Sequence, residues 1–258
     1  MKKTLLTLIT ITASTTCAFA QRTTEKMVVR QTDGKEVQFS VSAVDKIYFV
    51  EDEPQYVDLG LPSGTKWAAC NLGATAPEDY GDYYGWGCTE PYAEDDDITW
   101  QLYFQKLGGT GTSAGDCGTA KDPLQDYVEP NSKSIAGTEW DAAKKALGGL
   151  WRMPTKDEIQ ELISSCNWTW TTENGVNGYK VVSKSDATKY IFLPAAGNRY
   201  GTTLDQADVY GFYWTAAPHV NSPNAIYFSI FSVYRSVANR PRNYGYTIRP
   251  VYAAPKPE

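Results

Sequence analysis

The sequence predicts an α+β protein in which two short helices stand among many short strands. The clearest helix begins with a capping-box pattern, in which Thr155 is followed three positions later by Glu158. Apolar side chains then recur at helical spacing along one face: Ile159, Leu162, Ile163 and Cys166. Elsewhere, short apolar runs are separated by Gly and Pro, which is typical of brief strands and turns. This irregular mixture indicates the α+β class.

The first twenty residues have the pattern of a signal peptide. Lys2 and Lys3 precede an apolar run, and Ala18-Phe19-Ala20 supplies the small residues that signal peptidase needs. We therefore expect cleavage before Gln21, which leaves a mature chain of residues 21–258. A lipid anchor on Cys17 is the alternative, although Thr16 is larger than the residue usually found before a lipidated cysteine. The chain is expected to be exported, to the periplasm, the outer cell surface or the medium.

Residues 21–50 are expected to form a small N-terminal β module. Two β-rich runs flank Asp33-Gly34, a dipeptide that favours a hairpin turn, and a third short strand is predicted over residues 46–50. A short acidic linker follows at residues 51–54, where Pro54 interrupts the strand pattern. The main domain is then expected over residues 55–252, with a tail of residues 253–258. No stretch after the leader is apolar for long enough to cross a bilayer.

The first half of the main domain is expected to build much of the core. Residues 56–87 are predicted as brief strands and turns whose large aromatic side chains are buried: Trp67, Tyr83, Tyr84 and Trp86. Residues 90–130 are predicted as a long surface insertion, because they are rich in acidic, Gly, Thr and Ser residues. A second helix is expected to open at Thr138-Glu139-Trp140-Asp141 and to stop at Gly148-Gly149. Trp151 and Met153 are expected to enter the core in extended conformation just before the capping box.

The second half is predicted to be mainly strand. Residues 179–184 and 189–193 are expected to form a hairpin, and further strands are predicted over residues 212–216, 225–231 and 244–251. Polar loops rich in Asn, Ser, Arg and Tyr are expected to join these strands.

Composition limits the possible partners and cofactors. A net charge of -6 argues against binding to a phosphate backbone, so no nucleic-acid partner is expected. The chain has no C-x-x-C pair and a single histidine, His219, so neither a metal nor another cofactor is predicted. Four cysteines remain in the mature chain, and either two disulfides or buried free thiols fit them: Cys70, Cys88, Cys117 and Cys166.

Several motifs resemble those of secreted Bacteroidetes proteins that carry a Fibrobacter succinogenes major paralogous domain. They occur in the order YVDLGLPSGTKWAACNLGATAPEDYGDYYGWG, WRMPTKDEIQELI, NGVNGYKVV, IFLPAAG, FYWTAA and GYTIRPVY, over residues 55–252. The WRMPT motif with its helix also resembles the signature of the formylglycine-generating-enzyme version of the C-type lectin-like fold. The resemblance implies that fold: short twisted strands, two helices and long loops that expose a binding surface.

The same resemblance supplies tests for catalysis. Formylglycine-generating enzymes use two cysteines late in the domain, and this chain has none after Cys166. The related iron-dependent sulfoxide synthases need several histidines, and His219 stands alone. We therefore expect no enzymatic activity. A glycan hydrolase that uses paired carboxylates remains a less favoured alternative, with candidates only by proximity in sequence: Glu78 with Asp79, residues 94–97, and Asp205 with Asp208.

Two sequence features raise the question of calcium. Glu129-Pro130-Asn131 matches a tripeptide that C-type lectins use for calcium and sugar, but it lies early in the domain without a Trp-Asn-Asp partner, so a Pro turn is the better interpretation. The acidic run near Asp96 has oxygen ligands that could bind calcium weakly.

Residues 215–244 are the predicted recognition surface. This segment combines a strand core with His, Asn, Tyr and Arg, a mixture typical of paratopes. We expect these side chains to bind a glycan or a surface protein through C-terminal loops, in an adhesin-like role: His219, Asn221, Asn224, Tyr234, Arg235, Asn239, Arg240, Arg242 and Tyr244. The alternatives are that half of these side chains only cover the sheet, or that the chain is a fimbrial or matrix component with a self-complementary edge. Retroelement-driven diversification of this segment is a further hypothesis, which a downstream near-copy differing at adenines would support.

Overall fold

The structure is a computed structural model of the whole chain, and it describes residues 26–30, 36–40, 56–128, 132–220 and 223–252. The chain divides into two compact units, Met1–Pro54 and Gln55–Glu258. In the first unit, β1 (Lys26–Arg30) pairs antiparallel with β2 (Glu36–Ser40), as the sequence predicts. The leader, the Asp33-Gly34 turn, the third strand at 46–50 and the linker lie outside the described residues.

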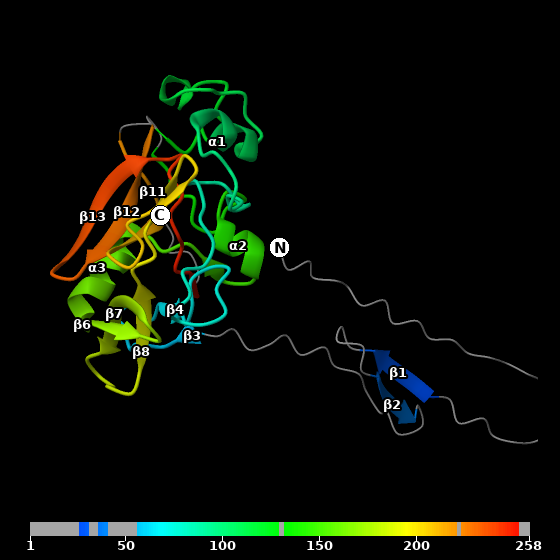
Figure 1. Cartoon of the computed structure of the whole chain (residues 1–258), viewed down its shortest axis with the longest axis vertical. Coiled ribbons are helices and arrows are strands. Elements are labelled where there is room, and N and C mark those ends of the chain that lie inside the picture. Colours follow the sequence, from blue (N-terminus) through cyan, green and yellow to red (C-terminus); the bar gives the residue numbers. More distant parts are fainter. Residues whose placement is uncertain (1–25, 31–35, 41–55, 129–131, 221–222, 253–258) are drawn as a thin grey trace, which may run out of the picture. The chain divides into compact units, whose positions relative to one another are not determined.

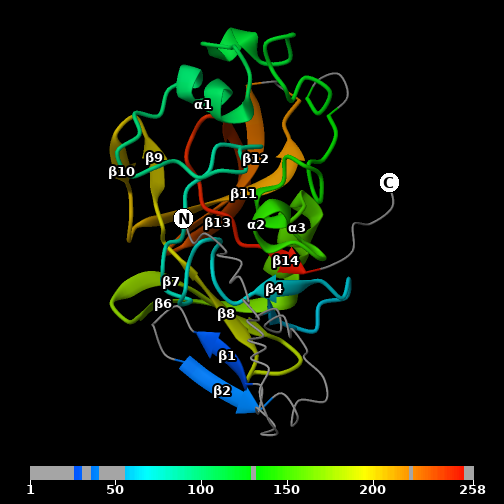
Figure 2. The same ribbon diagram turned by 90° about the vertical axis from the view of Figure 1, so that its right-hand side faces the viewer.

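The second unit combines three α-helices with four small antiparallel sheets among its described residues, which confirms the α+β class. The helices are α1 (Trp100–Leu107), α2 (Ala142–Leu147) and α3 (Lys156–Ser165), with a 3-10 helix η2 (Ala114–Asp116). Figures 1 and 2 show the helices distributed around the sheets rather than gathered in one layer. None of the helices in the described part of the chain has the length and apolar character that a bilayer crossing requires.

One four-stranded sheet joins the two ends of the second unit. Its strand order is β3 (Tyr56–Val57), β4 (Lys66–Ala68), β14 (Val251–Tyr252) and β5 (Trp151–Arg152). The strand predicted over 244–251 is therefore mostly wrong, since only its last residue belongs to β14. The preceding residues make single bridges to different neighbours, Tyr246 with Tyr84 and Thr247 with Tyr213, so no continuous ladder forms.

Helix α1 corrects the prediction of a surface insertion over 90–130 and raises the number of helices above the expected two. Thr99 caps its first turn, and Gly108 ends it at a φ of 77°, a conformation that suits glycine. Tyr103 and Phe104 are fully buried. The helix escaped prediction because eight residues give little periodicity, and because its first turn is rich in aromatic residues, which are weak helix formers.

The other two helices follow their capping signals. Helix α3 begins with the predicted capping box of Thr155 and Glu158 and ends at Cys166, where β6 (Cys166–Glu173) starts. The N-cap of α2 is Asp141 rather than Thr138, because the Asp141 carboxylate accepts from the Lys144 N–H and also binds the Met153 N–H. Strand β6 pairs with β7 (Val176–Ser183), which pairs with β8 (Tyr190–Pro194), so the predicted β7–β8 hairpin is confirmed.

The remaining strands form one small hairpin and one central sheet. Strand β9 (Asn198–Tyr200) pairs with β10 (Thr203–Asp205). The central sheet has the order β11 (Tyr210–Pro218), β12 (Asn224–Phe231) and β13 (Tyr234–Pro241), all antiparallel. The strands predicted at 212–216 and 225–231 are confirmed, whereas the expected polar loop after residue 231 is a full strand, β13.

Two cores pack on the central sheet from opposite sides. Because side chains alternate between the faces of a strand, Tyr213 and Phe228 lie on one face, where a core formed with α3 and the β6–β8 sheet covers them. Trp214 lies on the other face, in a core formed with Trp86 and α1. The expected burial of Trp67, Tyr83, Tyr84 and Trp86 is confirmed, as is that of Trp151 and Met153.

Candidate functional site

The predicted recognition residues lie along the β12–β13 hairpin and around its open end. The backbone N–H of His219 donates to the carbonyl of Asn224 at 3.2 Å, and the Asn224 side chain donates to Oδ1 of Asn239 at 2.8 Å. Asn221 lies outside the described residues. His219 and Asn224 therefore hold the chain near the start of β12.

The residues on β13 are divided between the two faces of the sheet. The register places Tyr234 opposite Phe231 and Arg240 opposite Ala225, so these two side chains share one face. Arg235 and Asn239 lie on the other face. The Arg235 guanidinium lies 5.1 Å from the ring centre of Trp168 and 5.1 Å from that of Tyr179, over the core side of the sheet. The predicted set is therefore not one continuous surface.

Arg242 does not belong to an exposed surface, which corrects its assignment as a ligand-binding residue. Its side chain is 0% exposed, and Nη2 donates to Oδ2 of Asp122, also fully buried, at 2.6 Å. The rings of Trp86 and Tyr103 lie 5.8 and 5.7 Å from the guanidinium. Arg242 thus ties the segment after β13 to the loop that contains Asp122.

The face of the central sheet that carries Tyr234 and Arg240 is rich in partly exposed aromatic side chains. We call the following set the aromatic face: Tyr200, Tyr210, Phe212, Tyr227, Phe231, Tyr234 and Tyr244. Within it, Tyr210 lies 4.7 Å from Phe231 and 5.8 Å from Phe212, with nearly parallel rings in both pairs. Phe212 is in turn 5.8 Å from Tyr227. The rings thus form a connected row across β11 and β12.

A second stack continues this row beyond the sheet. Tyr244 and Tyr200 are stacked at 4.5 Å, and the guanidinium of Arg240 lies 5.0 Å from the Tyr244 ring centre. Tyr246, which is buried, connects the two groups, since its ring lies 5.1 Å from Phe212 and 6.0 Å from Tyr244. Tyr200 is 49% exposed and Tyr234 is 56% exposed, so both ends of the aromatic face reach solvent.

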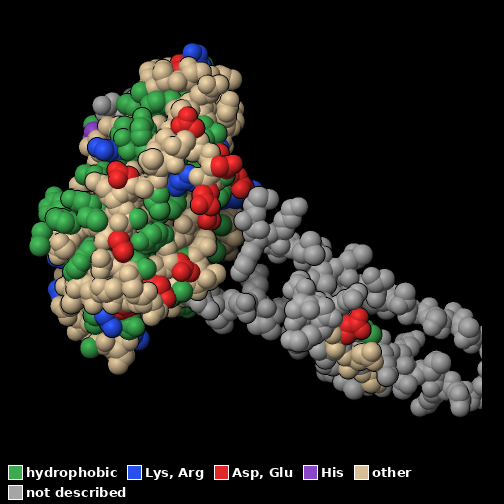
Figure 3. Space-filling view, in the orientation of Figure 1, with side chains coloured by type: hydrophobic (Ala, Val, Ile, Leu, Met, Phe, Trp, Pro, Cys, Tyr) green, Lys and Arg blue, Asp and Glu red, His purple; other side chains and the backbone are tan. Residues whose placement is uncertain are grey.

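Small hydroxyl-bearing residues lie between the rings. Ser229 is opposite Phe212 and Ser236 is opposite Ser229, and the two serine hydroxyls are 3.1 Å apart. Burial raises the pKa of the Tyr227 hydroxyl, which therefore remains protonated and able to donate near neutral pH. Figure 3 shows hydrophobic side chains gathered over the part of the domain where Figure 1 places β12 and β13. The face therefore offers both apolar ring surface and hydrogen-bonding groups.

The charge of this region differs from that of the whole chain. No Asp or Glu occurs from Val209 to Pro257, although the chain has 30 acidic residues and a net charge of -6. Arg240 is exposed at the border of the aromatic face. Arg240 therefore favours a neutral or negatively charged ligand at this border.

Sequence reasoning missed most of the aromatic face. On β11, the aromatic face contains Tyr210 and Phe212, and the residues between and after them, Gly211 and Tyr213, lie on the opposite face. On β12, Tyr227 and Phe231 alternate in the same way with residues of the opposite face. This period of two predicts strands, but it does not show which of their two aromatic faces is covered. Ser229, which lies among these rings, is itself buried, so it does not mark the accessible face either.

The acidic groups considered for catalysis have structural roles where their contacts are described. Asp79 accepts hydrogen bonds from the backbone of Thr75 and Ala76 in a tight turn, and Asp208 accepts one from the backbone of Asn177. Glu129-Pro130-Asn131 lies outside the described residues. No group of three or more His, Cys, Asp or Glu side chains suited to a metal occurs within the described ranges.

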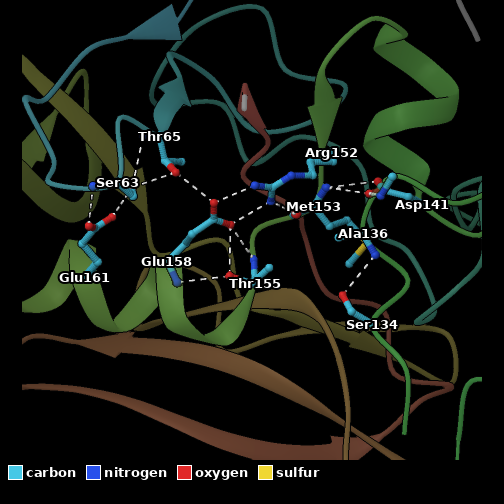
Figure 4. Close-up of polar contacts among 11 residues, drawn as sticks. Ser63, Thr65, Ser134, Ala136, Asp141, Arg152, Met153, Thr155, Glu158 and Glu161 are labelled. Carbon is cyan, nitrogen blue, oxygen red and sulfur yellow. Dashed lines mark hydrogen bonds and ion pairs between the residues drawn. The ribbon is translucent and has the colours of Figure 1, made fainter. Parts of the chain in front are cut away.

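A buried polar network beside α3 is also structural (Figure 4). Arg152 makes two hydrogen bonds of 2.7 Å to the Glu158 carboxylate, and the hydroxyl of Thr65 donates to the same group at 2.9 Å. Arg152 and Glu158 are both 2% exposed. These groups are satisfied by one another and closed to solvent, so they stabilise the fold rather than offer a reaction centre.

The four cysteines described in the structure are free thiols. Burial raises the pKa of Cys88 to about 12 and that of Cys166 to about 11. Because the thiolate is the nucleophilic form, these side chains are unreactive near neutral pH.

Comparisons with protein-family models, curated proteins and solved structures returned no match for this chain. Among the described residues, the aromatic face is the site best supported by ring contacts and exposure.

Proposed function

We propose that this protein binds a glycan on the aromatic face. The observation that carries the proposal is the series of rings from Phe231 to Tyr200, which is joined through the buried ring of Tyr246 and is partly open to solvent, most of all at Tyr200. An exposed apolar patch of this kind marks an interaction site, because burying it on a ligand is favourable. Tyrosine is well suited to recognition, since it is rigid and has both an apolar ring and a hydroxyl.

The chemistry of a sugar matches this face better than that of a purely apolar ligand. Sugar rings have apolar C–H surfaces that pack on aromatic rings, and hydroxyls that need hydrogen-bond partners. The Ser236 hydroxyl and the phenol groups of Tyr227 and Tyr244 supply such partners beside the rings. Arg240 adds a charge that would pair with the carboxylate of an acidic sugar.

The proposal also includes the type of domain and its location outside the cytoplasm. The sequence motifs over residues 55–252, together with the α+β arrangement of short strands, support a C-type lectin-like domain of the Fibrobacter succinogenes major paralogous type. The leader at residues 1–20 supports export, and a non-catalytic, adhesin-like role at the cell surface fits both. The binding surface is proposed on the strands of the central sheet rather than on C-terminal loops.

The test is glycan binding by the mature chain and by variants of one ring. After a glycan array has identified a ligand, we expect Tyr244→Ala to weaken its binding more than tenfold, as measured by calorimetric titration, because truncating an aromatic anchor typically costs about 2 kcal/mol or more. Tyr244→Phe keeps the stacked ring and should retain most of the affinity. Thermal unfolding of each variant establishes that the domain is intact.

Tyr190→Ala is the matched control, since Tyr190 is another exposed tyrosine but lies on β8 beside Lys180. Its affinity should equal that of the unaltered chain. A glycan that binds Tyr244→Ala and the unaltered chain equally would place the site elsewhere, and no binding to any glycan on the array would contradict the proposal.

A further inference from the structure

The outer edge of the central sheet is open. Strand β13 pairs with β12 on one side, and no strand in the described part of the chain pairs with its other side. Figure 1 shows β13 at the periphery of the second unit. Proteins usually protect such an edge with Lys, Pro or a bulge. β13 has Pro241 only at its last position and contains no Lys.

The hairpin geometry identifies which backbone groups of β13 point outward. A two-residue turn joins Phe231 to Tyr234, so these two residues form the closing hydrogen-bonded pair. The N–H and C=O groups of alternate residues then bond to β12, while those of the residues between them face away from it. The outward groups belong to Arg235, Val237 and Asn239, none of which is a proline.

We propose that β13 pairs with β13 of a second copy of this chain, antiparallel and centred on Val237. In this register Val237 lies opposite its own copy and Arg235 lies opposite Asn239 of the second copy. Each of these hydrogen-bonded pairs exchanges two backbone bonds, so every outward group of the three residues has a partner. The two sheets become one continuous sheet across a two-fold axis.

The side chains are complementary only in this register. No arginine faces an arginine, and Tyr234 lies opposite Arg240 of the second copy, where a ring and a guanidinium attract. If the register shifts by two residues in one direction, Pro241 lies opposite Arg235, and proline has no N–H to donate. If the register shifts by two residues in the other direction, Asn239 lies opposite Val233, which belongs to the turn and not to the strand.

The charge of β13 is compatible with a second copy in this register. β13 contains arginines and no acidic residue, and self-pairing in this register keeps the arginines apart by setting each one against a neutral side chain. The two-fold axis is perpendicular to the sheet, and both aromatic faces therefore lie on the same side of the dimer. The pairing forms without a glycan and does not rest on the proposed function.

The test is sedimentation velocity of the mature chain over a range of concentrations. We expect a reversible monomer–dimer equilibrium, because an interface built on one strand pair is at the small end for stable complexes. Val237→Pro removes an outward N–H that β12 does not use, and should shift the chain to monomer. Val237→Thr keeps that N–H and should leave the equilibrium close to that of the unaltered chain.

Substitutions of opposite charge at one exposed position give a second test that does not depend on proline. Asn239→Lys places a cation opposite Arg235 of the second copy and should raise the dissociation constant at least tenfold. Asn239→Glu places an anion there and should lower it. Asn239→Gln adds no charge and keeps an amide oxygen that can accept from Asn224, so it is the reference for both variants.

A chain that is monomeric at every concentration would overturn the proposal. So would a dimer that is unaffected by Val237→Pro, or one that responds alike to Asn239→Lys and Asn239→Glu. Glycan binding by monomeric Val237→Pro is measured separately, so that loss of the dimer and loss of the glycan site are distinguished.

Discussion

Replacing Glu158 by Gln is expected to lower the free energy of unfolding by about 3–5 kcal/mol, because it removes the negative charge that lies 2.7 Å from the buried guanidinium of Arg152. The carboxylate also accepts from the backbone N–H of Thr155 at 2.9 Å and from the Thr65 hydroxyl. One side chain thus connects the start of α3 with β5 and the loop before β4 (Figure 4). Urea or guanidinium denaturation measures the change.

Asp157→Asn is the matched control for this substitution. Asp157 lies in the same turn of α3 and carries the same charge, but it is exposed. Its loss should cost less than about 1 kcal/mol, the size of a surface charge near a helix N-terminus. Equal losses of stability in the two variants would show that the buried pair has no special role.

The dependence of stability on pH should identify the same carboxylate. Burial raises the pKa of Glu158, but the hydrogen bonds and charge of Arg152 outweigh it and hold the net pKa below the ordinary value of 4.5. A carboxyl whose pKa is lower in the folded than in the unfolded state stabilises the fold above its unfolded pKa, and this contribution is lost as the pH falls through the folded pKa. The difference in stability between the unaltered chain and Glu158→Gln should therefore shrink as the pH falls below about 4.5. A constant difference down to pH 2 would contradict this assignment.

Breaking the Arg242–Asp122 pair is the second substitution with a large expected effect. Asp122→Asn should destabilise the chain by about 3–5 kcal/mol, because both side chains are fully buried and the charge of Arg242 would lose its partner. Arg242→Met should cost a similar amount, since it leaves the Asp122 carboxylate buried opposite an apolar group. Denaturant unfolding of each variant gives the two values.

The double variant separates the ion pair from its surroundings. With both charges removed, no buried charge is left without a partner, so the double variant should be clearly less destabilised than the sum of the two single changes. Additive effects would indicate that the two side chains act independently. If Arg242→Met instead lost glycan binding and kept its stability, the result would support Arg242 as a ligand-binding residue.

Local signals were enough to predict much of the fold. The capping box at Thr155 and the apolar spacing behind it predict α3 within a residue, because both patterns depend only on neighbours in sequence. The strands β7, β8, β11 and β12 follow from short β-rich runs in the same way. Helix α1 was missed because eight residues with an aromatic first turn give little periodicity, and strand β13 was missed because most of its residues are polar.

The candidate site was harder to predict than the fold, because it depends on contacts between residues that are distant in sequence. A single sequence cannot tell an arginine that faces solvent from one that meets a buried acid, and Arg242 lies 120 positions from Asp122. The two faces of β11 and β12 are both aromatic, so alternation alone does not reveal which one α3 covers. The recognition residues on β13 were therefore chosen by type, and only the register divides them between the faces.

Fluorine NMR of the fluorotyrosine-labelled mature chain tests the glycan-binding proposal most directly. With the tyrosine signals assigned from single Tyr→Phe variants, titration with a glycan should shift the signals of Tyr200, Tyr210 and Tyr244 together, with one common affinity. The signals of Tyr103, which is fully buried, and of Tyr190 should stay unchanged. Binding that shifts Tyr190 and leaves the aromatic face untouched would contradict the account.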